Sequence, residues 1–274
     1  MVYSRPMNVD ASTLRLTEAR RVVVKVGSAV LTGPDGLNLA IIDHLAGELA
    51  ALHDAGRDVV LVSSGAVAAG RRRVAGSLAE GLNSPELHDL PGRQAASAVG
   101  QGRLMHAYDE ALGRRGKVIA QVLLTRDGLR LRKRFLNARN TLQRLLDWRV
   151  IPIINENDTV AVEEIFGDND TLASMALGLV GADLFVNLTS AAGVFDKNPD
   201  CHPDARRLAV IDDIHALDLA NLCDGKSSVG SGGMHSKLLA AQRAAQLGVP
   251  TLILSGRGDF SLTRALDDPS LGTL

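Results

Sequence analysis

Short apolar runs alternate along the chain with longer stretches that are apolar on one helical face only. The runs are rich in valine, isoleucine and leucine and four to seven residues long, which is typical of buried strands. They lie at 22–26, 59–62, 118–124, 151–154, 184–188 and 251–254. Because strands and helices alternate, the pattern predicts a mainly parallel sheet with helices on both of its faces.

The stretches between the runs carry helix signals. Asn38 is placed to cap a helix that has leucine or isoleucine at every third or fourth position and ends at Gly56. Further helices are predicted to begin at Ala66 and to span about 93–112, 132–147, 172–179, 214–222 and 234–247. Thr125 is a second candidate N-cap. Segment 78–91, with two prolines, is predicted to be an exposed loop and a candidate lid.

One predicted strand contains a proline, Pro152. Proline has no N–H group to donate to a sheet ladder. Either this strand lies away from the centre of the sheet, or Pro152 marks a position where no ladder donor is needed.

Composition narrows the class of protein. The 274 residues are 46% hydrophobic and 22% charged, with a formal net charge of -1, as in an ordinary soluble globular protein. Aromatic residues make up only 3%, which argues against nucleic-acid binding as the main task, and no apolar run is long enough to span a membrane. We expect a cytoplasmic protein with a loose tail at 1–20 and one domain at 21–274.

The densest group of polar residues follows the strand at 151–154. Six carboxylates fall within the fifteen positions 156–170, interleaved with asparagine and glycine. Charge clusters are most simply interpreted as solvated surface. Here, however, the cluster comes directly after a strand, where open α/β sheets place their ligands. The context favours a binding site.

Two other segments point to a bound anion. Lys25 lies inside an apolar strand, two residues before Gly27. Its side chain either reaches solvent from the end of the strand or places a cation at the edge of the sheet. In the second case, Gly27 would let a ligand approach the backbone. The Ser-Ser-Gly turn at 63–65 precedes a helix, a geometry that aims backbone N–H groups at an anion.

A glycine-rich segment at 230–233 also precedes a helix, with Lys237 in its first turn. It is either an anion site or a flexible surface loop. The nearby segment 220–227 almost matches a P-loop, but it follows a predicted helix rather than a strand, so we reject it. Two lysines, two Gly/Ser turns and an acidic pocket together suggest phosphoryl transfer to a small molecule.

Taken in order, these segments resemble the amino acid kinase family. The motifs are VKVGS at 24–28, SSGAVAAG at 63–70, FLNAR at 135–139, NEND at 155–158, GDND at 167–170 and GSGGM at 230–234. The resemblance covers 21–274 and implies a three-layer α/β/α sandwich with an open, mainly parallel sheet. It also implies transfer of the γ-phosphoryl group of ATP to the side-chain carboxylate of L-glutamate, giving glutamyl 5-phosphate for proline biosynthesis.

The resemblance assigns roles to individual residues. Lys25 and Lys237 would contact the transferring phosphoryl group, with Asp170 organising both lysines. The positions that match glutamate binding are Ser64, Asp158, Asn169, Asn155 and Asp168. Those that match nucleotide binding are Lys25, Thr189, Ser190, Ser231, Gly232, Gly233, Met234, His235, Ser236 and Lys237. We expect Asp158 to pair with the α-ammonium group and Ser64 and Asn169 to donate to carboxylate oxygens.

The resemblance further implies Mg²⁺ bound with ATP, no metal site of the protein's own, feedback inhibition by proline, and a homo-oligomer, either a dimer or a tetramer. The chain departs from the family pattern at Ser190, where similar kinases carry aspartate. Many relatives also continue into a small C-terminal PUA domain, which we do not expect here. Two alternatives therefore stay open: a related kinase acting on another acidic metabolite, and a catalytically impaired homologue that binds glutamate or proline.

Overall fold

The computed structural model describes residues 16–33, 36–161, 169–222 and 233–274. Within these ranges six strands form one parallel sheet in the order β5-β6-β4-β1-β7-β8. They are β1 (Arg21–Val26), β4 (Asp58–Ser63), β5 (Ile119–Leu124), β6 (Ile151–Glu156), β7 (Leu184–Thr189) and β8 (Thr251–Ser255). The short strands β2 (Thr32–Gly33) and β3 (Gly36–Leu37) form a separate antiparallel pair. The predicted parallel sheet is confirmed.

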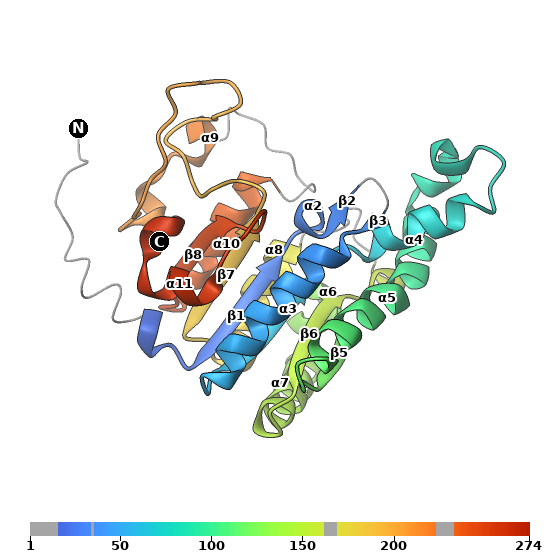
Figure 1. Ribbon diagram of the computed structural model, residues 1–274, viewed down its shortest axis with the longest axis horizontal. Coiled ribbons are helices and arrows are strands. Elements are labelled where there is room, and N and C mark those ends of the chain that lie inside the picture. Colours follow the sequence, from blue (N-terminus) through green and yellow to red (C-terminus); the bar gives the residue numbers. More distant parts are fainter. Residues whose placement is uncertain (1–15, 34–35, 162–168, 223–232) are drawn as a thin grey trace.

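Helices cover both faces of this sheet, so the predicted three-layer sandwich is also confirmed (Figure 1). One face packs against α3 (Leu39–Asp54), α5 (Leu90–Gly113) and α11 (Leu262–Asp267). The other packs against α7 (Arg132–Asp147), α8 (Asn169–Val180) and α10 (Met234–Gln246). Helix α4 (Ala66–Ala75) lies along α5, and together they extend beyond the sheet (Figure 1). No helix in the described ranges is long and apolar enough to cross a membrane.

The remaining helical elements are short. They are α2 (Ser28–Leu31), α6 (Arg126–Arg130), α9 (Leu219–Leu222), and the 3-10 turns η1 (Gly81–Asn83), η2 (Pro85–Leu87), η3 (Asp158–Val160), η4 (Ile214–Ala216) and η5 (Pro269–Leu271).

Side-chain alternation along the central strands decides what each face carries. In β1, Val22 packs with the α3/α5 layer and Val23 with the α8/α10 layer. Lys25 is two residues after Val23, so it points to the α8/α10 side. On the neighbouring strand β7, Asn187 is in register with Lys25. The sheet therefore places an ammonium group and an amide side by side beneath α8.

Most helix boundaries agree with the sequence pattern, and one prediction was wrong. Asn38 Oδ1 accepts from the backbone N–H of Ile41 at 3.2 Å, as an N-cap should. Thr125 is also an N-cap, for the short helix α6. Segment 78–91, expected to be a loop throughout, contains η1, η2 and the start of α5. Pro91 lies in the first turn of α5, where its missing N–H costs no intrahelical hydrogen bond.

Pro152 does not mark an edge strand, because β6 lies between β5 and β4. The register of β6 with β4 begins at Ile153, one residue after the proline. The second interpretation, that no ladder donor is needed at Pro152, is thus consistent with the observed pairing.

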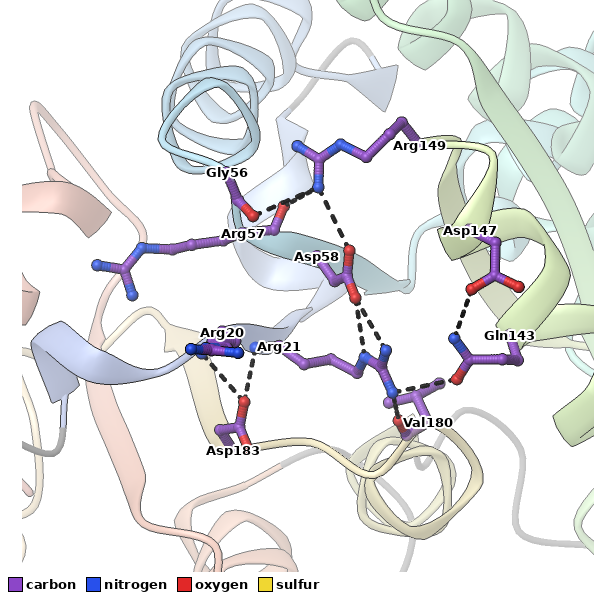
Figure 2. A network of polar contacts seen from close by, with 10 residues as sticks. All are labelled: Arg20, Arg21, Gly56, Arg57, Asp58, Gln143, Asp147, Arg149, Val180 and Asp183. Carbon is purple, nitrogen blue, oxygen red and sulfur yellow. Dashed lines mark hydrogen bonds and ion pairs between the residues drawn. The ribbon is translucent and has the colours of Figure 1, made fainter.

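A polar network ties the strands together at their amino ends (Figure 2). Asp58 Oδ2 accepts from Arg21 Nη2 at 2.9 Å and Nε at 3.2 Å, while its Oδ1 lies 3.3 Å from Arg149 Nη1. Arg21 Nη1 also donates to Gln143 of α7 at 3.2 Å. Asp183, just before β7, accepts from the backbone N–H of Arg21 at 2.8 Å. The network joins β1, β4 and α7 at the edge opposite the predicted site.

Candidate functional site

The predicted site residues in the described ranges lie at or beside the carboxyl edge of the sheet. Because β1, β4, β6 and β7 are parallel and adjacent, their last residues end at the same edge. Lys25 is the second-last residue of β1, Asn155 the second-last of β6, and Thr189 the last of β7. Ser64 follows the last residue of β4. Three predicted site residues, Asp168, Ser231 and Gly232, lie outside the described residues, as do Glu163 and Glu164.

Asp170, in the first turn of α8, is the centre of one polar cluster. Its Oδ1 lies 2.6 Å from Lys25 Nζ, and its Oδ2 lies 3.1 Å from Lys237 Nζ. Asn187 Nδ2 donates to Oδ1 at 2.9 Å, and Ser236 Oγ donates to Oδ2 at 2.7 Å. The carboxylate and both lysines are at most 4% exposed. Four elements, β1, β7, α8 and α10, thus meet at one buried carboxylate.

Electrostatics keep this carboxylate ionised. Burial by itself would raise the pKa of Asp170, but the charges of Lys25 and Lys237 outweigh it and lower that pKa to about 2. Two ammonium groups and one carboxylate leave a net positive charge at the edge of the sheet. Each carboxylate oxygen has at least two partners among the described residues, so Asp170 in this arrangement holds the lysines.

The position of Lys237 is unusual for a lysine. It lies in the first turn of α10, where the partial positive charge of the helix disfavours another cation. Contact with Asp170 offsets this cost. A cation held in an unfavourable place by a buried carboxylate suits the binding of an anionic ligand.

Gly27, between Lys25 and α2, has no structural need to be glycine. Its φ of -83° is open to any residue, and among the described residues an added Cβ would meet only Lys25 Nζ, at 3.8 Å. The absence of a side chain leaves space beside the Lys25 ammonium group. Gly65 differs, because its φ of 105° strongly favours glycine at the start of α4.

A second polar cluster begins at Asn169, the residue before Asp170. Asn169 Nδ2 lies 2.9 Å from the carbonyl oxygen of Ser63, 3.1 Å from Ser64 Oγ and 2.9 Å from Asn155 Oδ1. The Asn169 NH₂ group is thus engaged by protein acceptors, contrary to the expectation that it donates to a substrate carboxylate oxygen. Asn169 Oδ1 is buried and has no hydrogen-bond partner among the residues that the structure describes. The start of α8 therefore joins the lysine cluster to the ends of β4 and β6.

Asp158, in η3, is a buried carboxylate next to this second cluster. Ser97 Oγ of α5 donates a short hydrogen bond to its Oδ2. Burial raises the pKa of Asp158, against the opposing effects of the Ser97 hydrogen bond and of the charges on Arg93 and Arg126. A carboxylate whose charge is incompletely compensated is suited to a cationic ligand group.

The predicted nucleotide segments lie beside the lysine cluster. Thr189 is buried, and its carbonyl oxygen accepts from the N–H of Gly256 at 2.7 Å, whereas Ser190 is exposed. Gly233 is the N-cap of α10, and Met234, His235 and Ser236 form its first turn. Backbone N–H groups of that turn lie at the positive end of the helix.

Sequence reasoning missed several residues of the site. Asn187 carried a signal comparable to that of Lys25, a polar residue within an apolar strand. Ser97, Gln101 and Tyr108 carried none, because polar residues within a helix usually face solvent. A buried ion pair, Arg126 Nε to Glu156 Oε1 at 3.2 Å, was also missed.

Two cavities in the described ranges lie away from the lysine cluster. A cavity of about 580 Å³ is lined mainly by apolar residues of α10, β8 and segment 194–215, and one of about 570 Å³ is lined by residues 125–134 and 156–161. Neither lining includes Lys25, Asp170 or Lys237. Within the described ranges, no group of three or more His, Cys, Asp or Glu side chains is placed to hold a metal ion. The lysine cluster marks the candidate site.

Comparison with known proteins agrees with the observed fold. A family model, the amino acid kinase family, matches residues 20–255. Among solved structures, the UMP kinase from Bacillus anthracis superposes with a TM-score of 0.61, covering 93% of this chain and 95% of its own. At 15% sequence identity this likeness shows the fold alone.

Curated relatives are much more similar in sequence. The glutamate 5-kinase of Maridesulfovibrio salexigens is 64% identical over 94% of this chain and 67% of its own length. That of Nitratidesulfovibrio vulgaris is 62% identical over 94% of this chain and 66% of its own. That of Geobacter metallireducens is 51% identical over 96% of this chain and 69% of its own. The chain thus spans about two thirds of the length of these relatives.

Proposed function

The chain belongs to the amino acid kinase family, and from this premise we propose that it acts as a glutamate 5-kinase. It transfers the γ-phosphoryl group of ATP to the side-chain carboxylate of L-glutamate, producing L-glutamyl 5-phosphate, the first step of proline biosynthesis. The observation that carries this proposal is the buried Lys25–Asp170–Lys237 cluster, joined through Asn169 to a second polar cluster. Identity of 64% to a glutamate 5-kinase supports the choice of substrate.

In this proposal the two lysines neutralise the phosphoryl group as it moves. They approach it from different elements, Lys25 from β1 and Lys237 from α10. Positive groups that are fixed in advance stabilise developing charge without reorganising during the reaction. Asp170 holds both ammonium groups in place. The acceptor is an ionised carboxylate, so no general base has to remove a proton from it.

ATP and its Mg²⁺ bind beside this cluster in the proposed complex. The N-terminus of α10, from Gly233 to Ser236, and the end of β7 at Thr189 form the nucleotide side. A helix N-terminus with an adjacent lysine suits phosphate oxygens. Mg²⁺ arrives with the nucleotide and neutralises phosphate charge, which agrees with an Asp170 whose oxygens are already engaged by protein groups.

Glutamate binds at the second cluster. Asp158 pairs with the α-ammonium group, because its buried carboxylate is incompletely compensated. Ser64 Oγ accepts from Asn169, which leaves its hydroxyl proton to donate to a substrate carboxylate oxygen. In this arrangement a series of polar residues connects the amino-acid side to the lysines: Asp158, Asn155, Asn169 and Asp170.

The direct test is ADP formation that depends on L-glutamate, with ATP and Mg²⁺ present. The acyl phosphate can be trapped with hydroxylamine and identified as the hydroxamate. L-aspartate and N-acetyl-L-glutamate serve as competing substrates. No glutamate-dependent turnover at millimolar concentration would refute the proposal, and preferred turnover of another acidic metabolite would redirect it to a related kinase. Glutamate binding without turnover would identify a catalytically impaired homologue.

Site variants test the assigned roles. Lys237→Met should lower kcat by at least about 100-fold, the scale on which lost charge stabilisation acts, with little effect on glutamate binding. Lys197→Met is the matched control, since Lys197 pairs at the surface with Asp204, at 2.5 Å. An equal loss of kcat in both variants would mean that removing a lysine acts through folding rather than through the site.

Three further properties are proposed on the family resemblance. They are a cytoplasmic location, feedback inhibition by proline, and a dimer or tetramer. Exposed apolar side chains near the β5 edge, Val118, Leu123 and Trp148, are consistent with a contact between subunits. Light scattering of the purified chain, and glutamate kinetics with added proline, test the last two.

A further inference from the structure

Helix α5 presents three buried polar side chains on one face. Ser97, Gln101 and Tyr108 are spaced four and seven residues apart, so they lie one above another along the helix. They are 4%, 7% and 0% exposed. Polar groups buried this deeply are normally hydrogen-bonded. Each of the three bonds to a residue at the carboxyl edge of the sheet.

The three hydrogen bonds reach three segments of the proposed glutamate side. Ser97 Oγ donates to Asp158 Oδ2 in η3. Gln101 Oε1 accepts from Asn155 Nδ2 of β6 at 2.9 Å. The Tyr108 hydroxyl lies 2.9 Å from Ser63 Oγ at the end of β4. A single helix therefore contacts the predicted substrate residues Asp158 and Asn155 and the residue before Ser64.

The direction of the amide hydrogen bonds is set by the backbone. The N–H of Glu156 donates to Asn155 at 2.9 Å, and a backbone N–H requires an acceptor, so the atom facing it is Oδ1. Asn155 Nδ2 then points to Gln101, which must present Oε1. Gln101 Nε2 is left buried without a partner among the described residues.

The same reasoning extends to Asn169. Its amide faces the carbonyl oxygen of Ser63 and Asn155 Oδ1, both of which are acceptors. Asn169 must therefore direct Nδ2 at them, which leaves its Oδ1 as the acceptor that no described residue satisfies. A chain of amides thus runs from α5 through β6 to the start of α8, next to Asp170.

The position of α5 is itself closely determined. A Cβ on Gly100 would lie 1.8 Å from the carbonyl oxygen of Ala66, and one on Gly70 would lie 1.7 Å from that of Ala96. The backbones of α4 and α5 are therefore in direct contact. Because α4 begins immediately after the turn that contains Ser64, the polar face of α5 is held at a set distance from that turn.

We propose that Ser97 and Gln101 are positioning residues for the amino-acid substrate. Ser97 orients the carboxylate of Asp158, and Gln101 orients the amide of Asn155 and, through it, that of Asn169. Ser97 engages Oδ2 of Asp158, so that Oδ1 faces the substrate in this proposal. Gln101 acts through Asn155 and leaves Asn169 Oδ1 as an acceptor without a partner among the described residues. Acceptor oxygens of this kind favour a ligand with a free ammonium group. This inference rests on the proposed glutamate kinase activity and concerns how the substrate is selected.

The test compares variants that remove or keep each hydrogen-bonding atom. Gln101→Met removes the acceptor at similar volume, and Gln101→Glu keeps an acceptor oxygen. Ser97→Ala removes the hydroxyl, and Ser97→Thr keeps it. The matched control is Thr273→Val, which removes a hydroxyl that is 2% exposed and hydrogen-bonded far from the site. The measurements are kcat, the two KM values and the urea unfolding midpoint.

We expect Gln101→Met and Ser97→Ala each to raise the glutamate KM about 10-fold, as the loss of one buried hydrogen bond would, while kcat and the ATP KM change less than about threefold. Gln101→Glu and Ser97→Thr should recover most of the loss. Unchanged glutamate KM values would overturn the proposal. The proposal would also be overturned if kcat and both KM values changed equally and followed the unfolding midpoint. That pattern indicates a purely structural loss, which is what we expect of Thr273→Val.

A crystal structure of Gln101→Met separates failure of this inference from failure of the proposed function. If the wild-type protein does not phosphorylate glutamate, the proposed function fails on that result alone. A rotated Asn155 or Asn169 amide in the variant supports the positioning role. Unchanged amides in the variant overturn it, whatever the substrate.

Discussion

Replacing Asp170 with asparagine tests the electrostatic account of the site most directly. The substitution keeps the shape of the side chain but removes the charge that lies between Lys25 and Lys237. Lowering of the Asp170 pKa from 3.8 to about 2 corresponds to about 2–3 kcal/mol of favourable interaction with the ionised form, at about 1.4 kcal/mol per pKa unit. Because Asp170 is fully buried, solvent screening reduces this figure little.

The expected loss for Asp170→Asn is larger than that, about 3–5 kcal/mol, because two buried ammonium groups are left without a counterion. The amide can offer one oxygen to one lysine, while its NH₂ group faces another donor. Turnover should fall at least about 100-fold, since the lysines are no longer held in place. Saturating MgATP should narrow the stability difference, because its phosphates supply negative charge to the folded protein only.

Urea unfolding at several pH values is the assay. The folded pKa of Asp170 lies below its unfolded value, so its stabilisation is complete above about pH 4 and disappears as the pH falls toward 2. The difference between wild type and Asp170→Asn should therefore be greatest near neutral pH and shrink in acid. If the free energy of unfolding of the variant at pH 7 lies within about 1 kcal/mol of the wild-type value and its turnover is unchanged, Asp170 does not stabilise and position the two lysines.

Three other predictions, one of them with a control substitution, probe separate parts of the structure. Gly100→Ala should destabilise the protein by about 1–3 kcal/mol in urea unfolding, because its Cβ would collide with the backbone of Ala66. Gly102→Ala on the same helix is the control: a Cβ there would meet no described atom within 4 Å, so it should stabilise the protein by up to about 1 kcal/mol. Asp58→Ala should lower stability by about 1 kcal/mol, since the ion pairs of Asp58 are partly exposed. It should leave kcat and both KM values unchanged, because Asp58 lies at the amino edge of the sheet and the candidate site at the carboxyl edge. A change in the kinetic constants would contradict this separation. Asp158→Asn should raise the free energy of unfolding at pH 7, because burial raises the pKa of that carboxyl and penalises its ionised form. The same substitution should raise the glutamate KM at least about 10-fold. Lower stability with an unchanged KM would reverse the assignment of Asp158 to the substrate ammonium group.

Local sequence signals were sufficient for the architecture. Six apolar runs became six strands, and alternation with helices correctly indicated a parallel sheet with both faces covered. Caps at Asn38 and Thr125 were predictable because they depend on residues three positions away in the chain. The wrong loop at 78–91 arose where two prolines suggested a break, although proline is tolerated in the first turn of a helix.

For the candidate site, too, some features were predictable from the sequence and others were not. Lys25 could be nominated from the sequence because a lysine inside an apolar strand is costly without a purpose. Lys237 was nominated because it follows a glycine-rich helix start, and Asp170 because it lies in the acidic cluster after a strand. The family resemblance grouped the three. Nothing in the sequence shows that both lysines reach the same carboxylate, because they are 212 residues apart in the printed chain. That contact requires β1, α8 and α10 to pack on one face of the sheet.

By itself, then, the sequence determined the secondary structure, the fold and the chemical inventory, because periodicity and capping are local and charged residues in apolar runs are conspicuous. Only the tertiary structure decided which polar groups meet. Ser97 and Gln101 look like ordinary helix residues until α5 packs over the ends of β4 and β6 and buries them. A hydrogen bond between distant segments depends on side-chain direction and burial, which the order of residues along the chain does not express.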